Sequence, residues 1–105
     1  MTMNKTKLIV ASLALVSAGA FAATPQEIET KAGCLACHSK DKKIVGPAYK
    51  DVAAKYKGQD VTAKLMEKVR KGGSGVWGPI PMPPNPPEKI SDADLKLVIE
   101  SILKG

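Results

Sequence analysis

The chain has 105 residues and a formal net charge of +6, from sixteen Lys or Arg residues against ten Asp or Glu residues. This length allows one small domain at most. Only 4% of the residues are aromatic and no recognised nucleic-acid-binding motif is present, so the basic charge does not indicate a protein that binds nucleic acid.

The first 22 residues have the pattern of an export signal that is cleaved. Lys5 and Lys7 form a basic start, residues 8–18 are apolar, and Ala20-Phe21-Ala22 is a small-x-small cleavage site. The apolar run is shorter than the roughly 20 residues that span a bilayer. We therefore expect a single domain at residues 23–105, exported to the periplasm without a stable membrane anchor.

Four helices are predicted from capping residues and from the spacing of apolar residues. Thr24-Pro25-Gln26-Glu27 is a capping box that opens the first helix. Apolar side chains recur at helical spacing in the two middle segments, and glycines follow both as stops. Ser91 is the N-cap of the last helix. The expected helices are at about 25–32, 47–57, 60–71 and from 92 to the C-terminus.

Residues 72–87 are rich in Pro and Gly, which excludes a helix interior or a central strand. A loop of this length usually has a function. No segment of the chain alternates with period two, so the sequence predicts an all-α domain. At this size the apolar core is thin, and domains below roughly 70–80 residues usually need a disulfide, a metal or a cofactor for stability.

The segment Cys34-Leu35-Ala36-Cys37-His38 contains both cysteines and the one histidine of the chain. Its spacing is the signature of covalent haem attachment. Two thiols three positions apart on one turn reach the two vinyl groups at one edge of the porphyrin, and the adjacent histidine directs a ring nitrogen to the iron. We therefore expect one haem c per chain, bound through Cys34 and Cys37, with His38 as a ligand of the iron.

Two other readings of this segment stay open at this point, although both are less favoured. A disulfide or a thioredoxin-like redox pair is possible in an exported chain, but such pairs usually lie in a βαβ unit, which the sequence does not predict. A zinc site needs four ligands. Apart from carboxylates, only Cys34, Cys37 and His38 are available, and the last two are adjacent.

A second axial ligand of the iron has two candidates after the signal, Met66 and Met82. Met66 lies on an apolar helix face, where packing into the core is the preferred interpretation. Met82 lies between prolines, which restrict the backbone and favour an extended conformation at Met82 itself. A stiff loop can hold a thioether against iron with little loss of entropy, so Met82 is the preferred ligand.

Three segments, Cys34 to His38, Gly46 to Ala53 and Gly75 to Asn85, together with the terminal helix closely resemble the small bacterial class I c-type cytochromes of the cytochrome c-551 type. The resemblance covers nearly all of the chain after the signal. It implies an all-α fold of about four helices around one covalently attached haem.

The resemblance also implies roles for single residues. His38 and Met82 would be the axial ligands and so the metal-binding residues. The Pro47 carbonyl would accept a hydrogen bond from the other ring nitrogen of His38, which would raise the basicity of the ligand. Trp77 would donate its indole N–H to a haem propionate, and Asn85 would form a hydrogen bond near the Met82 sulfur.

Two departures from this type limit what is carried over. Lys68 stands where members can use an Arg near the propionate, and Lys lacks the planar pair of donors, so no such role is assigned to it. The connection to the last helix, Pro86-Pro87-Glu88-Lys89, is longer and stiffer than expected. This connection is therefore expected to influence the packing of the loop that contains Met82.

The function expected from the sequence is that of a periplasmic one-electron carrier, not an enzyme, with a low-spin haem iron held by His and Met. By family analogy its donor would be a redox protein such as a membrane cytochrome complex and its acceptor a nitrite reductase, an oxidase or a peroxidase. We expect a monomer that meets acidic docking surfaces on these partners. The lysines that could steer such encounters are Lys31, Lys40, Lys42, Lys43 and Lys50.

A rival function comes from another class, a ligand-binding or catalytic haem protein in which the sixth position of the iron is open. A labile Met82 would produce it. The sequence leaves this alternative to experiment.

Overall fold

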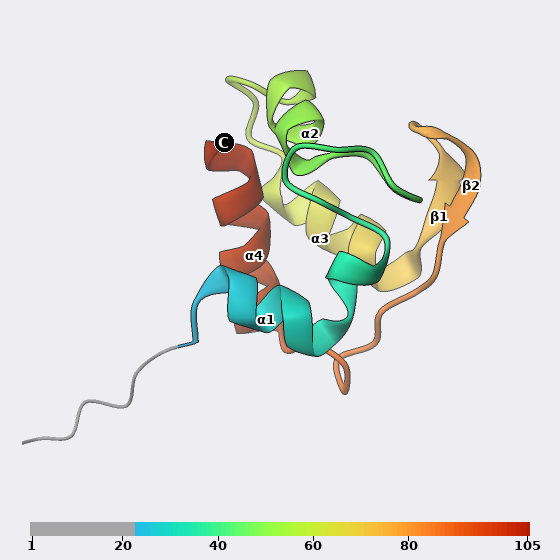
Figure 1. The fold of residues 1–105 in the computed structure, drawn as a ribbon. Coiled ribbons are helices and arrows are strands. Elements are labelled where there is room, and N and C mark those ends of the chain that lie inside the picture. The colour runs from blue at the N-terminus through green and yellow to red at the C-terminus, as the bar shows by residue number, and fades with distance from the viewer. Residues whose placement is uncertain (1–22) are drawn as a thin grey trace, which may run out of the picture.

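The computed structural model describes residues 23–105, and the predicted export signal at residues 1–22 lies outside that range (Figure 1). Within the described residues, no helix combines the length and the apolar character needed to cross a membrane. The elements in chain order are α1 (Pro25–Ala32), a 3-10 turn (Cys34–Ala36), α2 (Tyr49–Lys55), α3 (Thr62–Lys71), β1 (Gly73–Gly75), β2 (Gly78–Met82) and α4 (Asp92–Lys104).

The first and last helices begin where the capping residues predict. The Thr24 hydroxyl accepts a hydrogen bond from the Glu27 backbone N–H at 3.2 Å, and the Ser91 hydroxyl accepts one from the Asp94 N–H at the same distance. Each of these bonds satisfies an N–H group that has no partner within its own helix. The middle helices are confirmed too, but α2 and α3 each begin two residues later than predicted.

The C-terminal helix α4 packs against α1, α2 and α3. Leu95, Val98 and Ile99 form its buried face, and they join Ile28 and Ala32 of α1 in one core cluster, to which the buried Ile90 also belongs. Cys34 packs against the same cluster. The core therefore supports the turn that carries the two thiols.

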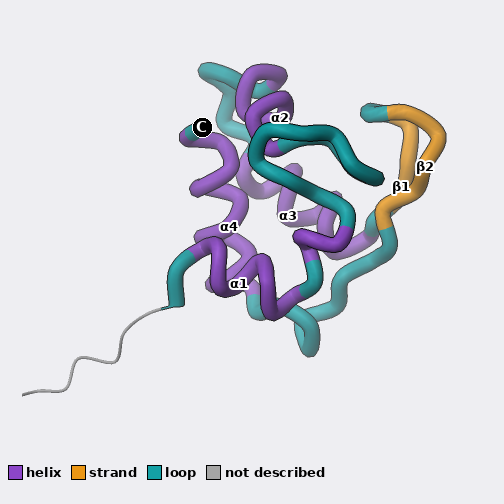
Figure 2. The backbone as a smooth tube through the Cα atoms, viewed as in Figure 1, coloured by secondary structure: helices purple, strands orange, loops and turns teal. Residues whose placement is uncertain are grey.

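The loop prediction for residues 72–87 is wrong in part, because β1 and β2 form a two-stranded antiparallel hairpin there. Gly73 pairs with Met82 and Gly75 with Gly78, with an irregularity in register between these pairs. Each strand of such a sheet has a free edge, where a proline nitrogen needs no hydrogen-bonding partner. Figure 2 shows the hairpin next to the end of α3, connected to α4 by a loop. The four predicted helices are all present in residues 23–105.

Candidate functional site

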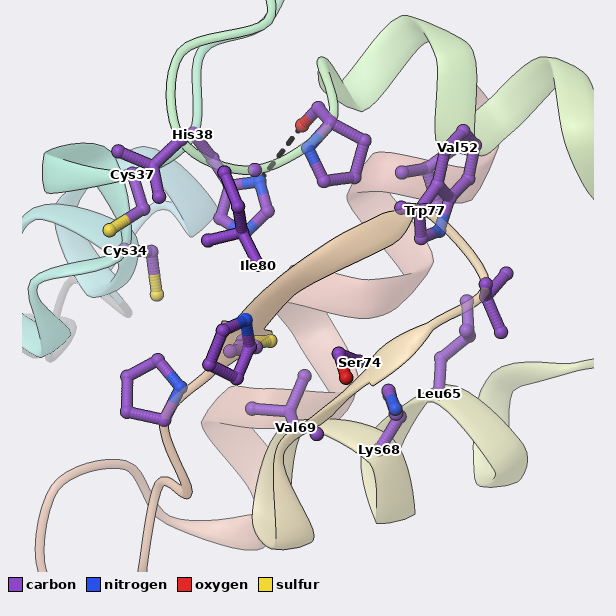
Figure 3. Close-up of a pocket in the computed structure, with 18 of the residues that line it drawn as sticks. Cys34, Cys37, His38, Val52, Leu65, Lys68, Val69, Ser74, Trp77 and Ile80 are labelled. Carbon is purple, nitrogen blue, oxygen red and sulfur yellow. Dashed lines mark hydrogen bonds between the residues drawn. The ribbon is translucent and has the colours of Figure 1, made fainter.

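One large pocket is lined by residues from the Cys34 turn, α2, α3, the hairpin and α4. Figure 3 shows Cys34, Cys37 and His38 together on one wall, and Leu65 and Val69 of α3 on another. Most of the other lining side chains are also apolar. The pocket therefore offers a flat apolar ligand a water-poor environment with two thiols and an imidazole at one edge.

The turn that presents the thiols is closed by backbone hydrogen bonds. The Cys34 carbonyl accepts from the Cys37 N–H at 3.2 Å and from the His38 N–H at 3.0 Å. This tight turn places both sulfur atoms and the imidazole on the lining of one pocket. The structure thus brings together the three residues that the sequence motif predicts to act together.

The His38 ring is held from three sides. Its Nδ1 donates a hydrogen bond to the Pro47 carbonyl oxygen at 2.8 Å, drawn as the dashed line in Figure 3. Tyr49 stacks on the ring, with 5.3 Å between ring centroids and 20° between the planes. A Cβ at Gly46 would overlap the imidazole, so only glycine leaves room for it. With Nδ1 protonated for the hydrogen bond, Nε2 keeps its lone pair for a metal ion.

The loop that contains Pro47 is fastened to the Cys34 turn and to α2. The Gly46 N–H donates to the Cys37 carbonyl at 2.8 Å, and the Tyr49 N–H donates to the Ser39 carbonyl at 2.9 Å. These bonds hold the Pro47 carbonyl at a fixed place relative to His38. The orientation of the imidazole is therefore set by backbone geometry.

Met82 ends β2 and lines the same pocket as His38, whereas Met66 packs against the core cluster. The core interpretation of Met66 is confirmed. Asn85 is buried, and its Nδ2 donates to the Val69 carbonyl at 3.3 Å and to the Pro83 carbonyl at 3.0 Å. Asn85 therefore fixes the backbone that follows Met82, and its expected hydrogen bond near the Met82 sulfur stays a prediction.

Trp77, at the tip of the hairpin, lines the pocket as the resemblance implies for a residue near the propionates. Lys68 also lines it. The Lys55 ammonium lies 5.6 Å from the centre of the Trp77 ring, a cation–π contact that the sequence did not reveal because twenty-two positions separate the two residues. The hydrogen bond from Trp77 to a propionate stays a prediction.

A buried carboxyl group, that of Glu29, lies on α1. Glu29 is only 5% exposed, and burial raises the pKa of its carboxyl above the ordinary value of 4.5. Burial, and then the charge of Glu29, raise the pKa of the free Cys34 thiol. The same two causes raise the pKa of Tyr49. Cys34 therefore stays a thiol in the folded chain before any attachment, and its nucleophilicity is low.

The structure also bears on the two alternatives for the cysteines. Both cysteines of the chain lie in the described part, and they are free, not paired in a disulfide. In residues 23–105, no three His, Cys, Asp or Glu side chains are grouped to hold a metal ion. The lining fits a covalently held haem better than a disulfide or a zinc ion. The thiols, the imidazole and the thioether all line one apolar pocket, and Gly46 leaves space for the imidazole of His38.

The comparisons with known proteins agree on one family. The family model described as Cytochrome c matches residues 22–104. The chain is 58% identical over 83 residues to a cytochrome c2 of Rubrivivax gelatinosus, covering 78% of this chain and 98% of that protein. It is 45% identical over 96 residues to a cytochrome c-551 of Pseudomonas aeruginosa, covering 90% and 89%.

A solved structure has the same fold. The crystal structure of wild-type Nitrosomonas europaea cytochrome c552 matches with a TM-score of 0.68 and 48% identity, over 74% of this chain and 95% of that one.

Proposed function

Because the chain belongs to the cytochrome c family, we propose that it is a periplasmic carrier of single electrons between respiratory redox partners, with His38 and Met82 as the two axial ligands of its haem iron. Membership of the family establishes haem c as the cofactor, attached through Cys34 and Cys37. When bound, the haem supplies an iron that exchanges one electron without any change in substrate bonds.

The observation that carries this proposal is the convergence of Cys34, Cys37, His38 and Met82 on one apolar pocket. The two proposed ligands are 44 positions apart in the sequence, and each is held by its own backbone network. His38 is oriented by the Pro47 carbonyl. Met82 is followed by the buried, hydrogen-bonded Asn85. Two ligands held by the fold favour an iron that changes charge with little rearrangement.

The chain contributes three things to electron transfer. The apolar walls exclude water, which strengthens the influence of every nearby charge on the potential of the iron. The Pro47 carbonyl increases the donor strength of the His38 ring. A thioether from Met82 favours the reduced state and raises the reduction potential within the roughly 0.8 V range that axial ligands span.

The visible spectrum of the reduced protein, recorded before and after addition of carbon monoxide, tests the ligand set. With both axial positions filled, we expect a spectrum that the gas does not change. The Met82→Ala variant should bind carbon monoxide at once and have a lower reduction potential, because a thioether that favours ferrous iron is lost. Met66→Ala is the matched control and should leave the spectrum unchanged. A prompt shift in the wild type would instead indicate an open, ligand-binding haem.

The proposed partners are redox proteins with acidic docking surfaces. Five exposed lysines lie on or close to the segment that carries the thiols, and their charge would attract such surfaces. Lys43 also lines the pocket. The other four are Lys31, Lys40, Lys42 and Lys50. A transient interface of this kind buries less than about 1,200 Å² in total, which suits rapid exchange.

A further inference from the structure

Arg70, in the last turn of α3, contacts both ends of the connection between β2 and α4. Its Nη1 donates to the Asn85 carbonyl at 3.1 Å and to the Ile90 carbonyl at 2.7 Å. Its Nη2 donates to the Asp92 carboxylate at 2.6 Å. Only 18% of the Arg70 side chain is exposed, whereas Asp92 is 83% exposed. The contacts to the two carbonyls are therefore the shielded part of this network.

The two carbonyls bracket the Pro86-Pro87-Glu88-Lys89 turn. This turn is closed at its base by the Lys89 N–H and the Ile90 N–H, which both donate to the Pro86 carbonyl. Asn85 and Ile90, at its two ends, are each only 5% exposed. Loss of the guanidinium would leave two carbonyls in a low-exposure environment without this donor, and such a loss costs more than the loss of an exposed contact.

The same end of α3 also holds the backbone near Met82. The Val69 carbonyl accepts a hydrogen bond from the Asn85 N–H at 3.0 Å and another from the Asn85 side chain. A Cβ at Gly72 would overlap the Met82 carbonyl oxygen. The Met82–Asn85 segment is therefore packed on the end of α3, and Arg70 ties this segment to the start of α4.

On these contacts we propose that Arg70 is a positioning residue for the axial methionine. By holding the Asn85 carbonyl and the Ile90 carbonyl together, it isolates the Met82 segment from movements of the Pro-rich turn, so the thioether stays in place. This inference rests on the proposed ligation by His38 and Met82. It assigns a role to a residue that does not line the pocket.

The test compares Arg70→Met with Lys71→Met in the protein with haem attached. Both variants lose one positive charge at the end of α3, but Lys71 is exposed and pairs with Glu67 on its own helix. We measure the rate at which carbon monoxide binds to the reduced protein and the weak red absorption band that a thioether bound to ferric iron gives. Arg70→Met should bind the gas about tenfold faster or more, with a weaker band, because charge-assisted hydrogen bonds are lost.

Two further variants separate positioning from charge. Asp92→Asn removes the ion pair but leaves both carbonyl contacts, so it should resemble the wild type. Arg70→Lys keeps one cationic donor and should restore part of the slow binding. Equal binding rates for Arg70→Met, Lys71→Met and the wild type would overturn the role of Arg70. Prompt binding in the wild type itself would overturn the proposed ligation instead, so the two failures are distinguishable.

Discussion

Glu29 is a carboxylic acid in a core that is otherwise mainly apolar. Its burial raises the pKa of the group because the charged form loses its hydration. In the unfolded chain the same group ionises near its ordinary value of 4.5. Between that value and the higher pKa of the folded state, the folded protein holds more protons than the unfolded chain. The contribution of Glu29 to the free energy of unfolding therefore decreases as the pH rises through that interval.

We expect the Glu29→Gln variant to be more stable than the wild type at pH 7 and equally stable below the ordinary pKa of the carboxyl. Glutamine has nearly the same size and does not ionise, so the variant removes the cost of burying a charge. Denaturant unfolding of the haem-loaded protein at both pH values measures the difference. Glu88→Gln, at an exposed position, is the control and should change little at either pH. Equal stability of Glu29→Gln and the wild type at pH 7 would show that burial of the Glu29 charge has no cost.

Single residues of the site differed in how well the sequence predicted them. Cys34, Cys37 and His38 lie within five consecutive residues, so their convergence follows from one local turn. Pro47 was assigned by resemblance alone, and Met82 also by its place between prolines. The structure adds the hydrogen bond to Pro47 and the shared pocket. Arg70 was missed because its partners are 15 to 22 positions away. A basic residue in the last turn of a helix gives no indication of such distant acceptors.

At the scale of elements, the junction between α3 and the hairpin places Met82. Gly72 is the C-cap of α3, with φ 69° and ψ −158°. Residues that have a Cβ adopt this backbone conformation only under strain. The same residue lies against the backbone of Met82 and Pro83. This junction therefore needs glycine for two separate reasons, backbone conformation and close approach.

The Gly72→Ala variant should lose about 2 kcal/mol or more of stability, and its Met82 should become labile. Gly58→Ala is a matched control, because Gly58 also has a positive φ of 76° but no atom within 4 Å of the position of a Cβ. The control should lose about 1 kcal/mol from strain alone, with no faster binding of carbon monoxide. Unfolding curves and binding rates for both variants give the comparison. Equal losses of stability in Gly72→Ala and Gly58→Ala would show that the close approach of Gly72 to Met82 adds nothing to the cost of the backbone strain.

Helices were predicted better than the hairpin for a physical reason. Thr24 and Ser91 are local caps, and apolar residues at helical spacing show which face is buried. The hairpin has neither kind of signal, because its strands are built largely from glycines and prolines. Its apolar side chains Ile80 and Met82 line the pocket and do not belong to the core cluster. Its pairing comes from the turn at residues 76 and 77 and from the end of α3.

At the scale of the whole molecule, charge is the property that would affect encounters with the proposed partners. The chain is basic overall, but net charge and local charge have different consequences. A local cluster near the pocket would direct an approaching anion to the pocket, whereas distant lysines would only raise the average attraction. The position of a lysine should therefore affect the rate of encounter more than the net charge of the chain does.

Electron transfer to ferricyanide, a small anionic oxidant, tests this expectation. The rate constant should fall as the ionic strength rises. At low ionic strength, Lys43→Gln should lower it by about twofold or more. Lys104→Gln removes the same charge from the end of α4, at a residue that does not line the pocket, and should have a smaller effect. If both variants slow the reaction equally, net charge alone accounts for the attraction.

The last helix has a consequence for the order of events during biosynthesis. Leu95, Val98 and Ile99 supply half of the buried cluster, and α4 is the element that contacts α1, α2 and α3. This helix follows the other helices in the chain, so α1, α2 and α3 have no such partner until α4 packs against them. During that interval Cys34 is not yet packed against the cluster. The Cys34 thiol is thus more accessible to haem before α4 packs than after it.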